Sequence, residues 1–208
     1  MLALLITSCK STEDMIQNEF EDYVQANFDD PKDVKEIVSI KRDFYVNSDS
    51  IIAKLEDGLL VGKSFDDKID SIIKNKKQVD SSRWKTPEFN DFFMSNLTLA
   101  MNADGYKSEI EEFISRAQDK EKVDLDIYII KYRIKIGDSL KLKEIYAVVD
   151  NNKDNISFYE ATNKPVEFEE YTHILSIGRK YLKDVTKHAN DWLRFYGYEW
   201  LNDITVNF

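Results

Sequence analysis

The sequence predicts an α+β fold with a helical N-terminal half. An antiparallel meander of about four strands follows and packs against a long C-terminal helix. Residues 123–161 are rich in strand-forming side chains and contain two turn signals. Residues 48–119, and again the segment after Pro165, repeat apolar side chains at helical spacing. Helices grouped beside an antiparallel sheet define this class. We therefore expect a single domain over residues 10–208, with a helical insertion around residues 48–119.

A helix and then a strand are predicted at the start of this domain. Ser11 or Thr12 supplies the hydroxyl that caps the first free amides of the helix. The apolar residues of the helix recur at helical spacing: Ile16, Phe20, Tyr23, Val24 and Phe28. Pro31 ends it, because the residue before a proline avoids the helical region. In the strand that follows, apolar and polar residues alternate apart from Arg42, which predicts one buried face. The residues of that face are Val38, Ile40, Phe44 and Val46.

Residues 48–119 are predicted to be mostly helical, with breaks at turn signals. Thr86-Pro87 starts a helix, because proline fits the first helical position. Asp104-Gly105 predicts a turn. Ser108 and Glu111 then have the spacing of a capping box, so we expect another helix to begin there.

Three consecutive strands and a long helix complete the domain. Isoleucine, tyrosine and valine dominate the strands, and turns fall near Gly137-Asp138 and Asn151-Asn152. The helix carries an apolar stripe in steps of four and three: Tyr171, Leu175, Gly178, Leu182, Val185, Ala189, Trp192 and Tyr196. This spacing is typical of a coiled coil, but Gly178 and the mixed side-chain sizes favour packing across the sheet.

Composition limits the classes of function. The chain has 208 residues, and a chain of this length can bury roughly 70% of its unfolded surface without metals or disulfides. Its net charge of −10 repels phosphate backbones, so we expect no nucleic-acid partner. No apolar run reaches the roughly 20 residues of a membrane-spanning helix.

The N-terminal residues have the features of a processing signal. Residues 1–6 are apolar, two small residues follow, and Cys9 is the only cysteine. The stretch Ile6-Thr7-Ser8-Cys9 resembles the lipobox of bacterial lipoproteins. The resemblance implies that residues 1–9 are a truncated signal and lipobox. It also implies that the Cys9 sulfur receives diacylglycerol, that the peptide is cut before it, and that the new amino group is acylated.

The same resemblance implies a place in the cell. A lipid on Cys9 would hold the protein at the bacterial cell envelope, with the membrane as its first partner. By the sorting habit of that family, Lys10 favours the outer membrane. Asp29-Asp30-Pro31 with Glu36, and Ile130-Lys131-Tyr132-Arg133, also resemble stretches of uncharacterised bacterial envelope proteins, a family that brings no activity with it.

No catalytic, metal or cofactor site is predicted. Gly137-Asp138-Ser139-Leu140 resembles the nucleophile block of GDSL-type hydrolases, but such a serine needs a strand-to-helix turn and here a strand follows. Asp150, Asn152 and Asp154 match the start of a calcium loop, yet the later ligands fail, which favours a solvated hairpin turn. The chain's two histidines, fifteen residues apart, cannot share a metal from one straight helix.

The candidate binding residues lie in the aromatic tract WLRFYGYEWL: Trp192, Tyr196, Tyr198 and Trp200. Such a cluster can form a platform for a sugar ring or a partner protein, or it can be the core that closes the C-terminus onto the sheet. We therefore expect a non-catalytic, lipid-anchored envelope protein that binds an unknown protein or glycan. The alternatives are a serine hydrolase that uses Ser139 and a structural subunit of an envelope complex.

Overall fold

The computed structural model describes residues 11–75, 86–163 and 166–195, and the chain forms two compact units. The sheet unit comprises Met1–Asn47 and Lys122–Glu169, and the helical unit comprises Ser48–Glu121 and Glu170–Phe208. The predicted α+β class, with its four-stranded antiparallel sheet and long C-terminal helix, is confirmed. The helical unit begins close to the start of the predicted insertion and also takes in most of the last helix.

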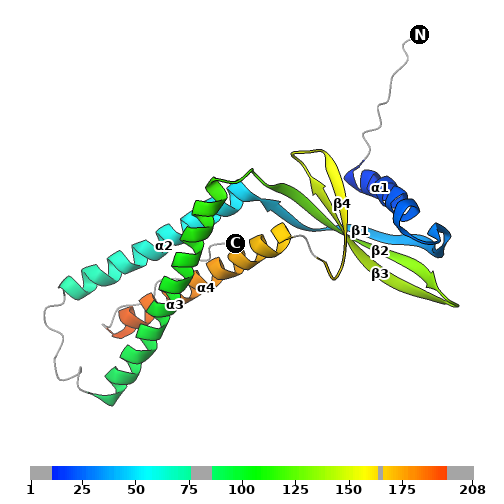
Figure 1. Ribbon diagram of the computed structural model, residues 1–208. Coiled ribbons are helices and arrows are strands. Elements are labelled where there is room, and N and C mark those ends of the chain that lie inside the picture. The colour runs from blue at the N-terminus through cyan, green and yellow to red at the C-terminus, as the bar shows by residue number, and fades with distance from the viewer. Residues whose placement is uncertain (1–10, 76–85, 164–165, 196–208) are drawn as a thin grey trace, which may run out of the picture. The chain divides into compact units, whose positions relative to one another are not determined.

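The sheet is a meander in which each strand pairs with the next along the chain (Figure 1). Its strands are β1 (Val34–Asn47), β2 (Asp124–Ile136), β3 (Ser139–Asp150) and β4 (Asn155–Glu160). Gly137 takes a left-handed backbone (φ +60°) in the two-residue turn between β2 and β3, which glycine does at little steric cost. The turn between β3 and β4 lies at residues 151–154, so both predicted turns are confirmed.

Helix α1 (Thr12–Asn27) covers one face of the sheet. Ser11 caps it: the side chain accepts a hydrogen bond from the Asp14 amide, and Asp14 accepts one from the Ser11 amide in return. The buried side chains of this core are Ile16, Phe20, Val24, Tyr128, Ile130, Tyr132, Ile145, Ala147 and Val149. The opposite face contacts the first turn of the last helix, where the Phe168 ring lies 5.5 Å from Phe44 and 6.1 Å from Tyr146.

Strand β1 does not keep the single buried face that its sequence predicted. Register shifts between Ile37 and Ser39 and between Arg42 and Phe44 change which side chains face α1. Ile40 opposes Ile130 in the core beneath α1, whereas Phe44 opposes Ile127 and contacts Phe168 on the other face. Val38, expected inside, is 46% exposed. The bulges therefore distribute the apolar residues of one strand between two faces.

The helical unit is built from α2 (Ser48–Asn75), α3 (Pro87–Gln118) and most of α4 (Val166–Phe195). Thr86 caps α3 as predicted, because its hydroxyl accepts a hydrogen bond from the Phe89 amide. The predicted turn at Asp104-Gly105 and the new helix start at Ser108 are wrong, since α3 runs through both. The Ser108 hydroxyl instead donates to the Asp104 carbonyl, and buried apolar residues on both sides of Gly105 hold the helix together.

Helix α2 contacts α4 where the Tyr181 ring of α4 lies against Gly62 of α2. A Cβ placed on Gly62 would lie 1.9 Å from the Tyr181 hydroxyl oxygen, so only glycine fits beneath this ring. Burial raises the pKa of Tyr181 to about 12. The predicted stripe of α4 is buried from Tyr171 to Ala189. Within the described residues, no helix has the length and apolar content needed to cross a membrane.

Candidate functional site

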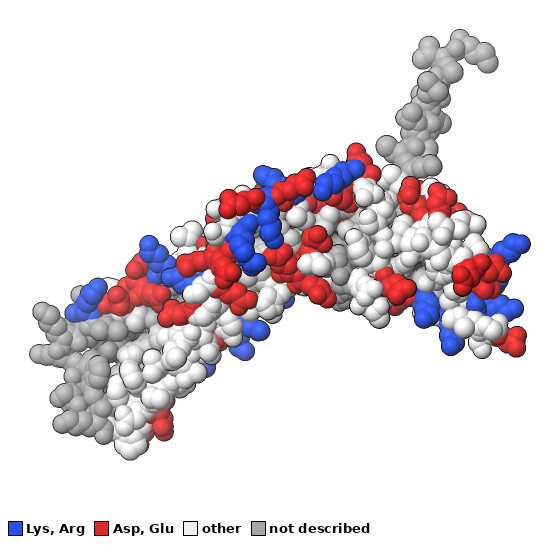
Figure 2. Space-filling model, viewed as in Figure 1, with Lys and Arg blue, Asp and Glu red and all other residues white. Residues whose placement is uncertain are grey.

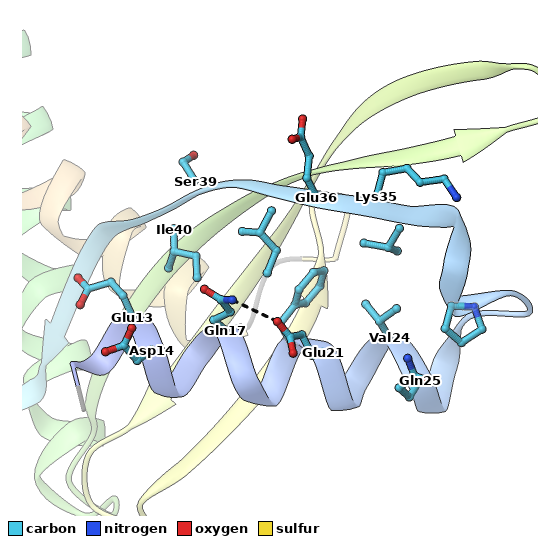
Figure 3. Close-up of a pocket in the computed structure, with 14 residues that line it drawn as sticks. Glu13, Asp14, Gln17, Glu21, Val24, Gln25, Lys35, Glu36, Ser39 and Ile40 are labelled. Carbon is cyan, nitrogen blue, oxygen red and sulfur yellow. Dashed lines mark hydrogen bonds between the residues drawn. The ribbon is translucent and has the colours of Figure 1, made fainter. Parts of the chain in front are cut away.

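A groove in the sheet unit is the first candidate site (Figure 3). It lies between α1 and β1 and has a volume of about 620 Å³. The residues of this α1–β1 groove are Glu13, Asp14, Gln17, Phe20, Glu21, Val24, Gln25, Pro31, Val34, Lys35, Glu36, Ile37, Ser39 and Ile40. Figure 3 shows Ile40 pointing from the strand toward the helix and Val24 pointing from the helix toward the strand, which gives the groove an apolar floor.

The walls of the groove are acidic. Four carboxylates line it, at Glu13, Asp14, Glu21 and Glu36, against one lysine, Lys35. Glu36 is already paired with Arg133, and Asp14 is used in the helix cap. The Glu21 carboxylate accepts a hydrogen bond of 3.1 Å from Gln17. Neither Glu13 nor Glu21 forms an ion pair with any residue that the structure describes, so both carboxylates remain available to a cation.

The groove is long enough for an extended chain. Its helical wall runs from Glu13 to Gln25, which at 1.5 Å per residue is about 18 Å. Its strand wall runs from Val34 to Ile40, roughly 20 Å at the rise of a strand. Strand β1 is also an outer strand of the sheet, and no strand among the described residues pairs with its far edge. Part of its backbone is therefore free to bind another extended segment.

A smaller pocket in the helical unit is the second candidate site. This helical-unit pocket has a volume of about 320 Å³, and α2, α3 and α4 all contribute to it. Its lining residues are Asp66, Ile69, Asp70, Phe93, Asn96, Leu97, Ala100, His188 and Trp192. It adjoins the N-terminal half of α3, where Figure 2 shows few charged side chains. Phe93, Met94, Leu97 and Met101 are exposed there.

Of the four predicted binding residues, the structure describes only Trp192. Its indole packs against Phe92 with the ring centroids 5.1 Å apart, and it also contacts Phe195 and His188. Trp192 therefore belongs to an aromatic cluster and also lines the helical-unit pocket. Tyr196, Tyr198 and Trp200 lie outside the described residues, and so does Cys9.

The residues that resembled catalytic or metal-binding motifs in the sequence lie in turns or in surface contacts. Ser139 is the first residue of β3 in a hairpin, without the strand-to-helix turn that a hydrolase nucleophile needs. In the turn after β3, Asp150 accepts a hydrogen bond from the Asn152 amide. His173 lies 2.8 Å from a Glu109 carboxylate oxygen at the surface. No group of three or more potential ligands for a metal ion occurs within the ranges that the structure describes.

Sequence reasoning missed the groove and most of the helical-unit pocket. Asn96 offered one signal, because it stands among apolar residues of α3 and is only 2% exposed. An amide buried on an apolar helix face is informative, since buried polar groups need partners. Its neighbours across the pocket, Asp66 and His188, are too distant in sequence for any local pattern to pair with it.

Comparison with protein-family models, with curated proteins and with solved structures found no match for this chain.

Proposed function

We propose that this chain is a lipid-anchored binding protein of the bacterial cell envelope, and that its α1–β1 groove takes an extended, basic stretch of a partner protein. The observation that carries the proposal is the excess of carboxylates on the α1 wall, at Glu13, Asp14 and Glu21, beside a β1 wall of matched length. Lysine or arginine side chains of an extended peptide would meet Glu13 and Glu21, while its apolar side chains would cover the partly buried Val34, Ile37 and Ile40.

Lipid anchorage would place the groove close to the membrane. The lipobox-like stretch supports acylation at Cys9, and α1 begins at Thr12. Three residues of fully extended chain span at most about 11 Å. The sheet unit would therefore sit at the membrane surface, and its partner would be another component of the envelope, with Lys10 favouring the outer membrane.

Labelling in cells tests the anchor. Bacteria that express the chain are fed a clickable fatty acid, and the protein should carry the label only when Cys9 is present. Cys9→Ser should lose the label and leave the membrane fraction. Equal labelling of both forms would refute acylation at this residue.

A binding measurement tests the groove on the full-length Cys9→Ser chain, which isolates the groove from the lipid. Fluorescence anisotropy would follow a short labelled peptide of alternating lysine and valine, with alternating glutamate and valine as the comparison. Replacing Glu13 and Glu21 together by glutamine should weaken lysine-peptide binding by about fivefold, because each exposed ion pair is worth about 0.5 kcal/mol. The binding should also weaken with added salt.

Glu19→Gln is the matched control, because Glu19 is exposed on α1 but does not line the groove. It should leave the affinity unchanged. Equal binding of the two peptides, or equal losses from the control and the double variant, would argue against this site.

A further inference from the structure

Two residues of the helical-unit pocket carry buried polar atoms with no hydrogen-bond partner in the part of the chain that the structure describes. Asn96 donates its side-chain amide to the Phe92 carbonyl at 3.0 Å, but its Oδ1 is buried without a partner. The His188 Nδ1 is likewise buried without a partner among the described residues, and the Asn96 backbone lies close enough to act on the pKa of the ring. Because one nitrogen of a neutral imidazole donates, the other is an acceptor. Two residues that line the same pocket thus each hold a buried polar atom without a partner among the described residues.

The charges around the pocket add to this demand for a donor. Asp66 and Asp70 line it from α2, and Asp104 and Asp191 also act on its groups. Asp70 is paired with Lys74 and Asp191 with Lys187, and Lys107 acts on Asp66. Burial lowers the pKa of His188, so the ring is neutral at pH 7. Burial raises the pKa of the Asp66 carboxyl, which shows that this group is partly withdrawn from water. Once these pairs are counted, Asp66 and Asp104 remain against Lys107, so the region carries a small net negative charge.

The remaining walls are apolar and aromatic. Trp192 and Phe93 offer ring surfaces, and Ile69, Leu97 and Ala100 fill the space between them. A tryptophan face attracts a cation, and the attraction grows as water is removed. A volume of about 320 Å³ lies at the lower end of the range for small-molecule sites.

From these contacts we infer that the helical-unit pocket binds a small organic cation, a protonated amine with a compact apolar body. The ammonium group would donate to Asp66, Asn96 Oδ1 and His188 Nδ1, and the apolar body would lie against Trp192 and Phe93. This site is separate from the α1–β1 groove and does not depend on the function proposed for it.

Isothermal titration calorimetry on the full-length Cys9→Ser chain tests the inference, with benzylammonium as the probe. Benzyl alcohol, which keeps the ring but lacks the charge, is the comparison. Benzylammonium should bind in a saturable one-to-one manner, and benzyl alcohol about tenfold more weakly or worse, because hydrogen bonds to charged groups are the stronger ones.

Two variants on α2 locate the binding. Asp66→Asn keeps the shape and removes the charge, so benzylammonium binding should weaken by about tenfold. Asp67→Asn is the matched control, because it removes the same charge one residue away and Asp67 does not line the pocket. Far-UV circular dichroism would establish that both variants are folded.

Three results would overturn the inference: no binding of benzylammonium by the unsubstituted pocket, equal affinity for benzyl alcohol, or equal losses in the two variants. The groove is tested independently, since Glu13→Gln with Glu21→Gln should leave benzylammonium binding unchanged.

Discussion

The two concave sites of this protein arrange their polar groups in opposite ways. In the α1–β1 groove the carboxylates stand at the exposed walls, and the floor is apolar at Phe20, Val24 and Ile40. In the helical-unit pocket the acceptors of Asn96 and His188 are buried, and the aromatic side chains form the walls. The groove therefore suits a long ligand whose charges stay near water, whereas the pocket suits a compact cation that leaves water.

The difference also has an energetic side. Charges at an exposed wall contribute modestly and are screened by salt, whereas an unpaired buried acceptor costs about 1–3 kcal/mol until a donor reaches it. Ligand binding should consequently be strongly salt-dependent at the groove and weakly so at the pocket. The three changes that follow test each site and the packing behind it.

The largest loss of stability is expected from replacing Phe20, which lines the groove and packs in the core of the sheet unit. Phe20 is fully buried and lies within 6.2 Å of Tyr23, Tyr132 and Phe158, measured between ring centroids. Phe20→Ala should lower the free energy of unfolding by about 3–5 kcal/mol, because it removes a large buried ring and leaves a cavity. Chemical denaturation measures the loss, and hydrogen exchange should place it in β2 and β3. A loss below about 1 kcal/mol would mean that the helix does not depend on this contact.

A smaller effect is expected where α2 meets α4. Gly62→Ala would place a methyl group 1.9 Å from the Tyr181 hydroxyl oxygen, and the buried ring has little room to move. The variant should be destabilised by about 1–3 kcal/mol, the usual cost of overpacking.

Gly105→Ala is the control for this substitution. It lies in α3 with nothing within 4 Å of the new Cβ, and should stabilise the chain by about 0.5–1 kcal/mol. Thermal unfolding compares the two variants, and a neutral Gly62→Ala would show that the helices can separate at this point.

The smallest effect concerns the pH dependence of the helical-unit pocket. Burial raises the pKa of Asp66 above its ordinary 3.8, so the carboxylate is lost earlier on acidification than in an exposed aspartate. Burial lowers the pKa of His188 from 6.5, and its protonation on acidification adds a positive charge to the pocket. Both changes weaken cation binding, so affinity for benzylammonium should fall as the pH is lowered from 7.

The same carboxyl affects stability in the opposite sense. A raised pKa means that the folded state favours the protonated form, so this contribution to stability is present at low pH and is lost as pH rises through the folded-state pKa. Asp66→Asn should flatten both trends, as titration calorimetry and denaturation at several pH values would show. An unchanged pH profile in this variant would remove Asp66 from the site.

Much of the sheet unit could be predicted because its signals are local. The Ser11 cap, the glycine turn at Gly137 and the alternation of β2 and β3 each depend on residues within a few positions of one another. Strand β1 was predicted, but its burial on two faces was not, because its bulges exist only relative to β2, where Arg42 pairs with Asp126. The turn expected at Gly105 failed for a related reason, since tertiary burial of Ala103 and Ile110 outweighs the helix-weakening effect of one glycine.

By itself the sequence determined the fold class, the acidic surface, the positions of most helices and strands, and the cysteine on which an anchor would depend. Only the tertiary structure decided that α1 and β1 enclose a groove, and that residues as distant as Asp66, Asn96 and His188 line one pocket. The physical reason is the range of the interactions. Caps, turns and periodicity act between near neighbours in the chain, whereas a binding site is made by side chains that meet only after the helices have packed.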